Sequence, residues 1–198
     1  MWQQAHGGCP DASCAYIQFH GMADTSCPGD TAFISAGIGS SRPFINSSHT
    51  RLMGQITIVS ASWYARSPAA RRANRFTKTL RTIASSVGLS WTVNTPAGSP
   101  CNLKAASNLL ARVLNGVPAG QECDHIGTTA LASGSFLSVE QEPAREGAQW
   151  DEAVWARSVR ETFTPRCESG YDLDAGAVGC IPRDASPGLP PPVRRWSL

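Results

Sequence analysis

The segment SPAARRANRFTKTLRTIASSVGLSWTV, residues 67–93, combines the clearest helix pattern of the chain with a strand pattern directly after it. Ser67 and Pro68 suit an N-cap and a first helical position, and apolar residues then recur at helical spacing as far as Gly88, which favours a helix end. Residues 89–93 alternate between apolar and polar side chains, as is typical of a strand. A helix that leads into a strand predicts an α/β or α+β fold.

Other segments on either side fit the same fold class. Residues 15–19 and 54–59 are predicted strands, and residues 102–116 are a second predicted helix that ends at Asn-Gly. Residues 148–163 are a third predicted helix, in which Arg157 and Glu161 are spaced to pair on the surface. We therefore expect a sheet with flanking helices.

The length and composition bound the number of domains. A chain of 198 residues suffices for one domain with a substantial core. We expect a single α/β domain over residues 1–164 and a cysteine-bounded hairpin over residues 165–181. The proline-rich residues 182–198 are expected to form a disordered tail.

The charges are distributed unevenly along the chain. Residues 31–121 contain ten Lys or Arg and no Asp or Glu, whereas residues 122–198 contain twelve acids and seven bases. The basic middle can pair with the acidic last third, or it can bind an anionic polymer, with nucleic acid as one candidate. The strand pattern after residue 90 argues against a helix-turn-helix motif. The predicted site for an anionic partner lies on the helix of residues 67–88, at Arg71, Arg72, Arg75 and Lys78.

The seven cysteines favour disulfides over a metal site. None forms a CxxC pair, and the spacing of His6, Cys9, Cys14 and His20 matches no zinc pattern, so we predict no metal and no other cofactor. A disulfide between two of Cys9, Cys14 and Cys27 is the preferred interpretation of that segment. Because the count is odd, one thiol should be free or bridge to another chain.

Disulfides imply an oxidising compartment, so we expect a secreted or cell-envelope protein. Asn46 begins a triplet that fits N-glycosylation. Residues 1–4 lack the features of a leader, which is expected to be missing from this chain; an intracellular protein with free cysteines is the alternative. No apolar run is long enough to span a membrane.

The segment YIQFHGMADTSCP, residues 16–28, joins a predicted strand to the sequence His-Gly-x-x-Asp. Over residues 14–30 it resembles the acid-bearing strand end of α/β-hydrolases, most closely the poly(3-hydroxybutyrate) depolymerase and feruloyl esterase group. The resemblance implies a partial α/β-hydrolase sheet and hydrolysis of acyl esters. It also implies that Asp24 orients a catalytic histidine, for which we predict His125, on a loop after a helix.

The nucleophile that this resemblance requires is not found in the chain. In the family the catalytic residues follow one another along the chain in the order Ser, Asp, His. The Gly-x-Ser-x-Gly pentapeptide that carries the serine occurs nowhere in this sequence. The prediction is therefore a secreted serine-esterase-like hydrolase, either a fragment or inactive. The alternative is a non-enzymatic extracellular binding or structural protein with a basic face, and a truncated or mis-framed gene product is a third possibility.

A second resemblance concerns the C-terminal cysteines. The pattern Cys167-x-x-Gly-Tyr-x-Leu with Cys180 closing it resembles the last loop of an EGF-like module. The resemblance implies a hairpin closed by a Cys167–Cys180 disulfide. It implies no calcium site, because the earlier cysteines of such a module are absent at their spacings.

Overall fold

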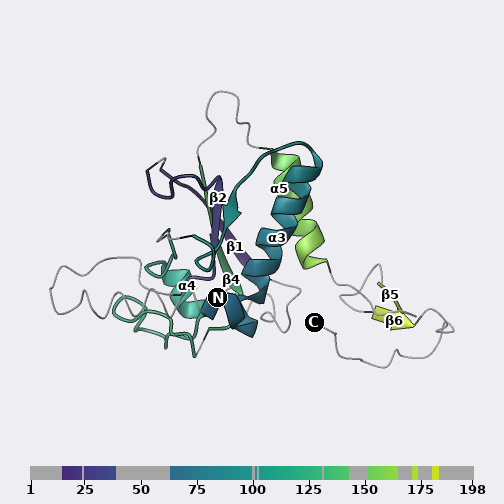
Figure 1. Ribbon diagram of the computed structural model, residues 1–198. Helices are drawn as coiled ribbons and strands as arrows, with labels where there is room; N and C mark the ends of the chain where they lie inside the picture. The colour runs from purple at the N-terminus through teal and green to yellow at the C-terminus, as the bar shows by residue number, and fades with distance from the viewer. Residues whose placement is uncertain are drawn as a thin grey trace.

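The structure is a computed structural model, and its described residues form a four-stranded sheet, a two-stranded sheet and flanking helices. The larger sheet has the order β1-β4-β2-β3 and is covered by helices on both faces (Figure 1). The mixed α/β class predicted from the sequence is thus confirmed. The described residues are 15–23, 25–38, 63–99, 101, 103–130, 132–142, 151–164, 171–173 and 180–182.

Strand β4 (Phe136–Gln141) lies in the interior of the large sheet. It pairs in parallel with β1 (Tyr16–Gly21) and antiparallel with β2 (Ala32–Ser35), and β2 pairs in parallel with the short β3 (Val93–Asn94). The predicted strand at residues 15–19 is therefore confirmed as β1. Only the last residue of the predicted strand 89–93 belongs to β3.

Helices α3 (Arg71–Ser86) and α5 (Glu152–Phe163) pack together on one face of the sheet (Figure 1). The main core lies between these helices and the strands, and Trp155 contacts Phe19 of β1 with ring centroids 5.4 Å apart. The helices predicted within residues 67–88 and 148–163 are thus confirmed as α3 and α5. Ser67 Oγ accepts from the Ala69 N–H at the start of the short 3-10 helix η1 (Pro68–Ala70), which runs into α3.

Helix α4 (Leu109–Leu114) covers the other face of the sheet and packs on Phe136. The predicted helix of residues 102–116 was too long at its N-terminal side. Asn108 caps the observed helix, since its Oδ1 accepts from the Ala111 N–H at 3.1 Å, and Ala105 has a positive φ of 54° that a helix does not allow. The apolar residues before the cap, Leu103 and Ala106, are thus in turn and coil conformations while still packing inward.

A disulfide joins Cys27, in the loop after β1, to Cys101, after β3, with Cα atoms 5.2 Å apart. Local pairing of Cys27 with Cys9 or Cys14 was wrong, because sheet pairing brings the β1–β2 loop next to the segment after β3. Cys123 is a free, exposed thiol, in line with the odd cysteine count. Cys9 and Cys14 lie outside the described residues.

At the C-terminal end, β5 (Tyr171–Leu173) and β6 (Cys180–Pro182) form an antiparallel pair where the hairpin was predicted. Cys167 lies outside the described residues, so its disulfide with Cys180 stays a prediction. The same holds for the predicted strand 54–59, for Asn46 and for residues 183–198 of the predicted tail, whereas Pro182, expected to begin that tail, belongs to β6. Within the described part of the chain, no helix is both long and apolar enough to cross a membrane.

Candidate functional site

The carboxyl ends of β1 and β4 bring His20 and Glu140 together. The two residues are register partners on adjacent parallel strands, so their side chains project from the same face of the sheet. In sheets with parallel strands, ligands commonly bind just beyond the carboxyl ends. Both side chains are half-buried, and their charges interact. An imidazole and a carboxylate therefore lie on neighbouring strands where solvent can reach both.

The surroundings of Glu140 are partly apolar. Phe33 of β2 lies directly opposite it and belongs to an apolar cluster with Met22, Cys27 and Cys101. Burial raises the pKa of the Glu140 carboxyl above its usual value, whereas a hydrogen bond from Ser138 and the charge of His20 lower it. Ser138 Oγ donates to Glu140 Oε1 at 3.1 Å. The Ser138 hydroxyl thus holds one oxygen of the Glu140 carboxylate, and His20 faces it from the neighbouring strand as its register partner.

Such a pair is suited to general acid–base chemistry. A carboxylate beside an imidazole fixes its tautomer and stabilises the imidazolium that forms when the ring accepts a proton. Ser138 is fully buried at 0% exposure and is engaged with Glu140, so it is not placed as a nucleophile. The arrangement can activate a water molecule.

Asp24, the acid predicted from the sequence, lies outside the described residues. Met22, two residues before Asp24, donates its backbone N–H to the Gln141 carbonyl at 2.6 Å, at the carboxyl ends of β1 and β4. The loop that carries Asp24 therefore begins at the same edge of the sheet as the His20–Glu140 pair.

His125, the histidine predicted from the sequence, is exposed and belongs to a loop at the other end of the sheet. Two residues later, Gly127 packs so closely on Asn115 and Ile38 that an added Cβ would lie 2.7 Å from Asn115 Cβ. Asn115 Nδ2 donates to the Ala36 carbonyl at 2.8 Å, just beyond the end of the antiparallel strand β2.

The loop that begins at Met22 and the loop of residues 115–130 thus lie at opposite ends of the sheet (Figure 1). The six residues of β1 span about 20 Å between these ends. The structure makes His20 and Glu140 register partners on β1 and β4, and a pairing of Asp24 with His125 stays a prediction.

The basic side chains of α3 serve partly within the fold. Arg71 and Lys78 are exposed, whereas Arg72 Nη1 donates to the Ser133 carbonyl at 3.1 Å. Arg81, on the same helix, donates to the Val93 carbonyl. Arg75 is half-buried. Binding of an anionic polymer at this helix stays a prediction.

Sequence reasoning did not identify Glu140 or the pairing of His20. The pattern that could have found Glu140 is the segment FLSVEQ, residues 136–141, which follows Ala-Ser-Gly-Ser and precedes a Glu-Pro pair. Its first four residues are buried on both faces of the sheet, so the apolar run does not alternate as a half-buried strand does.

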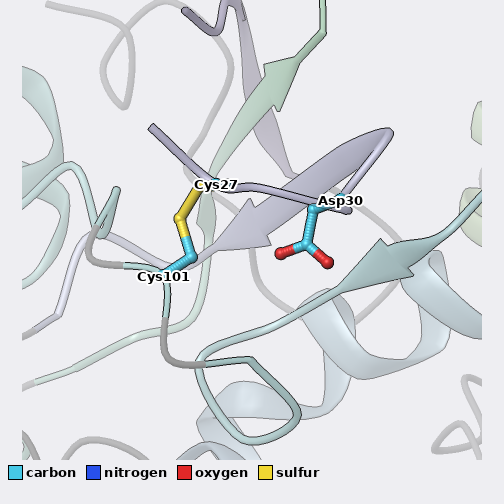
Figure 2. A group of neighbouring side chains, drawn as sticks. All are labelled: Cys27, Asp30 and Cys101. Atoms are coloured by element: carbon cyan, nitrogen blue, oxygen red, sulfur yellow. A yellow bond between two sulfur atoms is a disulfide. The ribbon is translucent and has the colours of Figure 1, made fainter. Parts of the chain in front are cut away.

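A second cluster of chemically active groups lies beside the first. Cys27, Asp30 and Cys101 are all buried, and their potential ligand atoms lie within 4.8 Å of one another (Figure 2). With the disulfide formed, the two sulfur atoms are not free thiolates.

Comparison with known proteins identifies no relative. No protein-family model matches the chain, and neither a curated protein nor a solved structure matches it. The α/β-hydrolase resemblance of residues 14–30 therefore remains an expectation, and function is argued from the site alone.

Proposed function

We propose that the protein hydrolyses small acyl esters, with His20 as general base and Glu140 as the carboxylate that orients it. The observation that carries the proposal is the register of β1 and β4, which makes these two residues neighbours at the carboxyl ends of parallel strands. The charge interaction between them supports the same assignment.

The proposed proton transfers use this pair and water. The His20 imidazole accepts a proton from a water molecule while the water oxygen bonds to the acyl carbon of the ester. When the bond from the acyl carbon to the alcohol oxygen breaks, the imidazolium returns the proton to the departing alkoxide. The products are a carboxylic acid and an alcohol, and Glu140 stabilises the imidazolium between the two proton transfers.

The resemblance to α/β-hydrolases supports this class of substrate, because its motif includes the segment His20-Gly21 as well as Asp24. His20 takes the role of the base, and a water molecule takes the role of the serine nucleophile, whose Gly-x-Ser-x-Gly motif does not occur in the sequence. The Cys27–Cys101 disulfide supports a secreted or cell-envelope location for the reaction.

The test is hydrolysis of p-nitrophenyl acetate and p-nitrophenyl butyrate by the purified chain. Since general base catalysis contributes about 100-fold or more, His20→Gln should lower kcat/KM by about that factor. Glu140→Gln should lower it by a smaller factor, because the base remains but is no longer oriented. Glu161→Gln removes an exposed carboxylate on α5 that pairs with Arg157, and it should leave the rate unchanged.

Two results would contradict the proposal. The first is a wild-type rate no higher than that of buffer. The second is a His20→Gln variant that keeps the wild-type rate while its circular dichroism spectrum shows a folded chain.

A further inference from the structure

We propose that the chain with its cysteines reduced binds one zinc ion through Cys27, Asp30 and Cys101. One sulfur from each cysteine and one carboxylate oxygen lie within 4.8 Å of one another. All three residues are buried, with exposed fractions of 3% for Cys27, 6% for Asp30 and 7% for Cys101. Thiolates combined with a carboxylate form a ligand set that suits zinc, which binds three protein ligands and leaves a fourth position for water.

Hydrogen bonds of the backbone and of the Ser99 hydroxyl hold the three ligands together. The Asp30 N–H donates to the Cys27 carbonyl at 3.0 Å, so the turn that carries Cys27 also places Asp30. Ser99 links Asp30 to Cys101, because its Oγ donates to Asp30 Oδ2 at 2.7 Å and accepts from the Cys101 N–H at 3.2 Å. These contacts do not depend on the bond between the two sulfur atoms.

A chain of side-chain hydrogen bonds orients the carboxylate. Arg81 Nη2 donates to Asn94 Oδ1 at 2.8 Å, and Asn94 Nδ2 donates to Asp30 Oδ1 at 2.6 Å. Each Asp30 oxygen thus accepts a side-chain hydrogen bond and keeps a further lone pair for another partner. Outer partners of this kind orient the ligands of metal sites and raise their affinity.

The zinc site forms in two steps, reduction of the disulfide and binding of the metal. A dithiol reductant gives two electrons and two protons to the disulfide, which becomes two thiols, and the dithiol becomes a disulfide. Zinc then binds the two sulfurs as thiolates and releases their two protons to solvent. The same loops are therefore tied together by a disulfide in the oxidised chain and by zinc in the reduced chain.

The experiment uses the full chain with Cys9, Cys14, Cys123, Cys167 and Cys180 replaced by serine, so that only Cys27 and Cys101 can supply thiolates. The protein is reduced with a dithiol, the dithiol is removed without air, and zinc chloride is titrated in. Cobalt chloride serves as a parallel probe, because thiolate ligation gives a charge-transfer absorption. The expected result is one zinc per reduced chain and none in the oxidised chain.

Variants separate the ligand role of Asp30 from a structural one. Asp30→Asn should weaken zinc binding by more than the roughly 10- to 100-fold loss typical of an outer partner, and Ser99→Ala should weaken it by an amount within that range. Asp124→Asn, which neutralises an exposed acid elsewhere, should leave the affinity unchanged. A circular dichroism melt of each reduced variant shows whether it is folded. If the Asp30→Asn variant is unfolded, the zinc affinity of the Ser99→Ala variant takes its place as the test, and an unchanged affinity there contradicts the proposed site.

The proposal is overturned by any of three results. These are a reduced chain that binds no stoichiometric zinc, an oxidised chain that binds it equally well, and a folded Asp30→Asn variant with unchanged affinity.

Discussion

Individual polar side chains connect the layers of this fold. The Tyr64 hydroxyl oxygen accepts from the Ala36 N–H at 2.6 Å, although the tyrosine is 0% exposed. Burial raises the pKa of the Tyr64 hydroxyl, so it stays neutral and keeps this bond at any ordinary pH. The hydroxyl thereby satisfies a backbone group just after β2, where the chain leaves the sheet.

Replacing Tyr64 with phenylalanine should lower the free energy of unfolding by about 1–3 kcal/mol, because the buried Ala36 N–H loses this partner. Urea denaturation measures the change, and hydrogen exchange at Ala36 should accelerate. Val87→Ala, at a 52% exposed position, is the control and should have little effect. An unchanged unfolding midpoint in the Tyr64→Phe variant would show that the bond is not needed.

The Glu140 carboxyl predicts a pH dependence of stability. Burial raises its folded pKa above the usual 4.5, with smaller opposing effects from Ser138 and His20. A group with a raised pKa binds its proton more tightly when folded, so its contribution is complete below the unfolded pKa and is lost as the pH rises through the folded pKa.

The Tm of Glu140→Gln minus the Tm of wild type should therefore increase as the pH rises from below 4.5 through the raised pKa of Glu140. Thermal melts across this range measure the difference. A difference that stays constant or decreases would contradict the burial of this carboxyl.

Individual elements differ in how far their sequence determines them. Helix α3 was predictable because Ser67, Pro68 and a regular apolar stripe act over a few residues. Helix α4 was overestimated because the apolar residues Leu103 and Ala106 extend the same pattern in front of its cap. A pattern of apolar residues reports burial, and here burial continues into a segment that is not helical.

Asn108 makes α4 depend on one side chain. Its Oδ1 caps the helix and its Nδ2 donates to Gln18 Oε1 of β1 at 2.7 Å. Asn108→Ala should lower the free energy of unfolding by about 1 kcal/mol or more, because it removes the N-cap as well as the contact to β1. Asn108→Asp keeps the capping oxygen but not the donor to Gln18, so it should recover the capping part of that loss. Guanidinium denaturation of both variants tests this, and equal losses would contradict the capping role.

At the scale of the whole molecule, non-local contacts carry the features that the sequence did not reveal. Glu140 pairs with His20 across 120 residues, and Cys27 bonds to Cys101 across 74. Local patterns predict helices and single strands, but they do not say which strands become neighbours. Asp24 and His125 are predictions from motifs along the chain, whereas the proximity of His20 and Glu140 follows from the order β1-β4-β2-β3.

The disulfide should contribute strongly to the stability of the whole molecule. A bridge across 74 residues restricts the unfolded chain by about 4 kcal/mol in the chain-entropy description. Cys27→Ser with Cys101→Ser should lower the free energy of unfolding by roughly that amount in guanidinium denaturation with a chelator present. Cys123→Ser, at the free exposed thiol, is the control. Equal stability of the two variants would contradict a stabilising role for the bridge.

The comparison of His20→Gln with His125→Gln tests the proposed function most directly, because each variant loses one imidazole and the two lie at opposite ends of the sheet. The measurement is kcat/KM for p-nitrophenyl butyrate with both variants shown to be folded. The account predicts a loss of about 100-fold for His20→Gln and a wild-type value for His125→Gln. A loss confined to His125→Gln would contradict the account and favour the pair of Asp24 and His125.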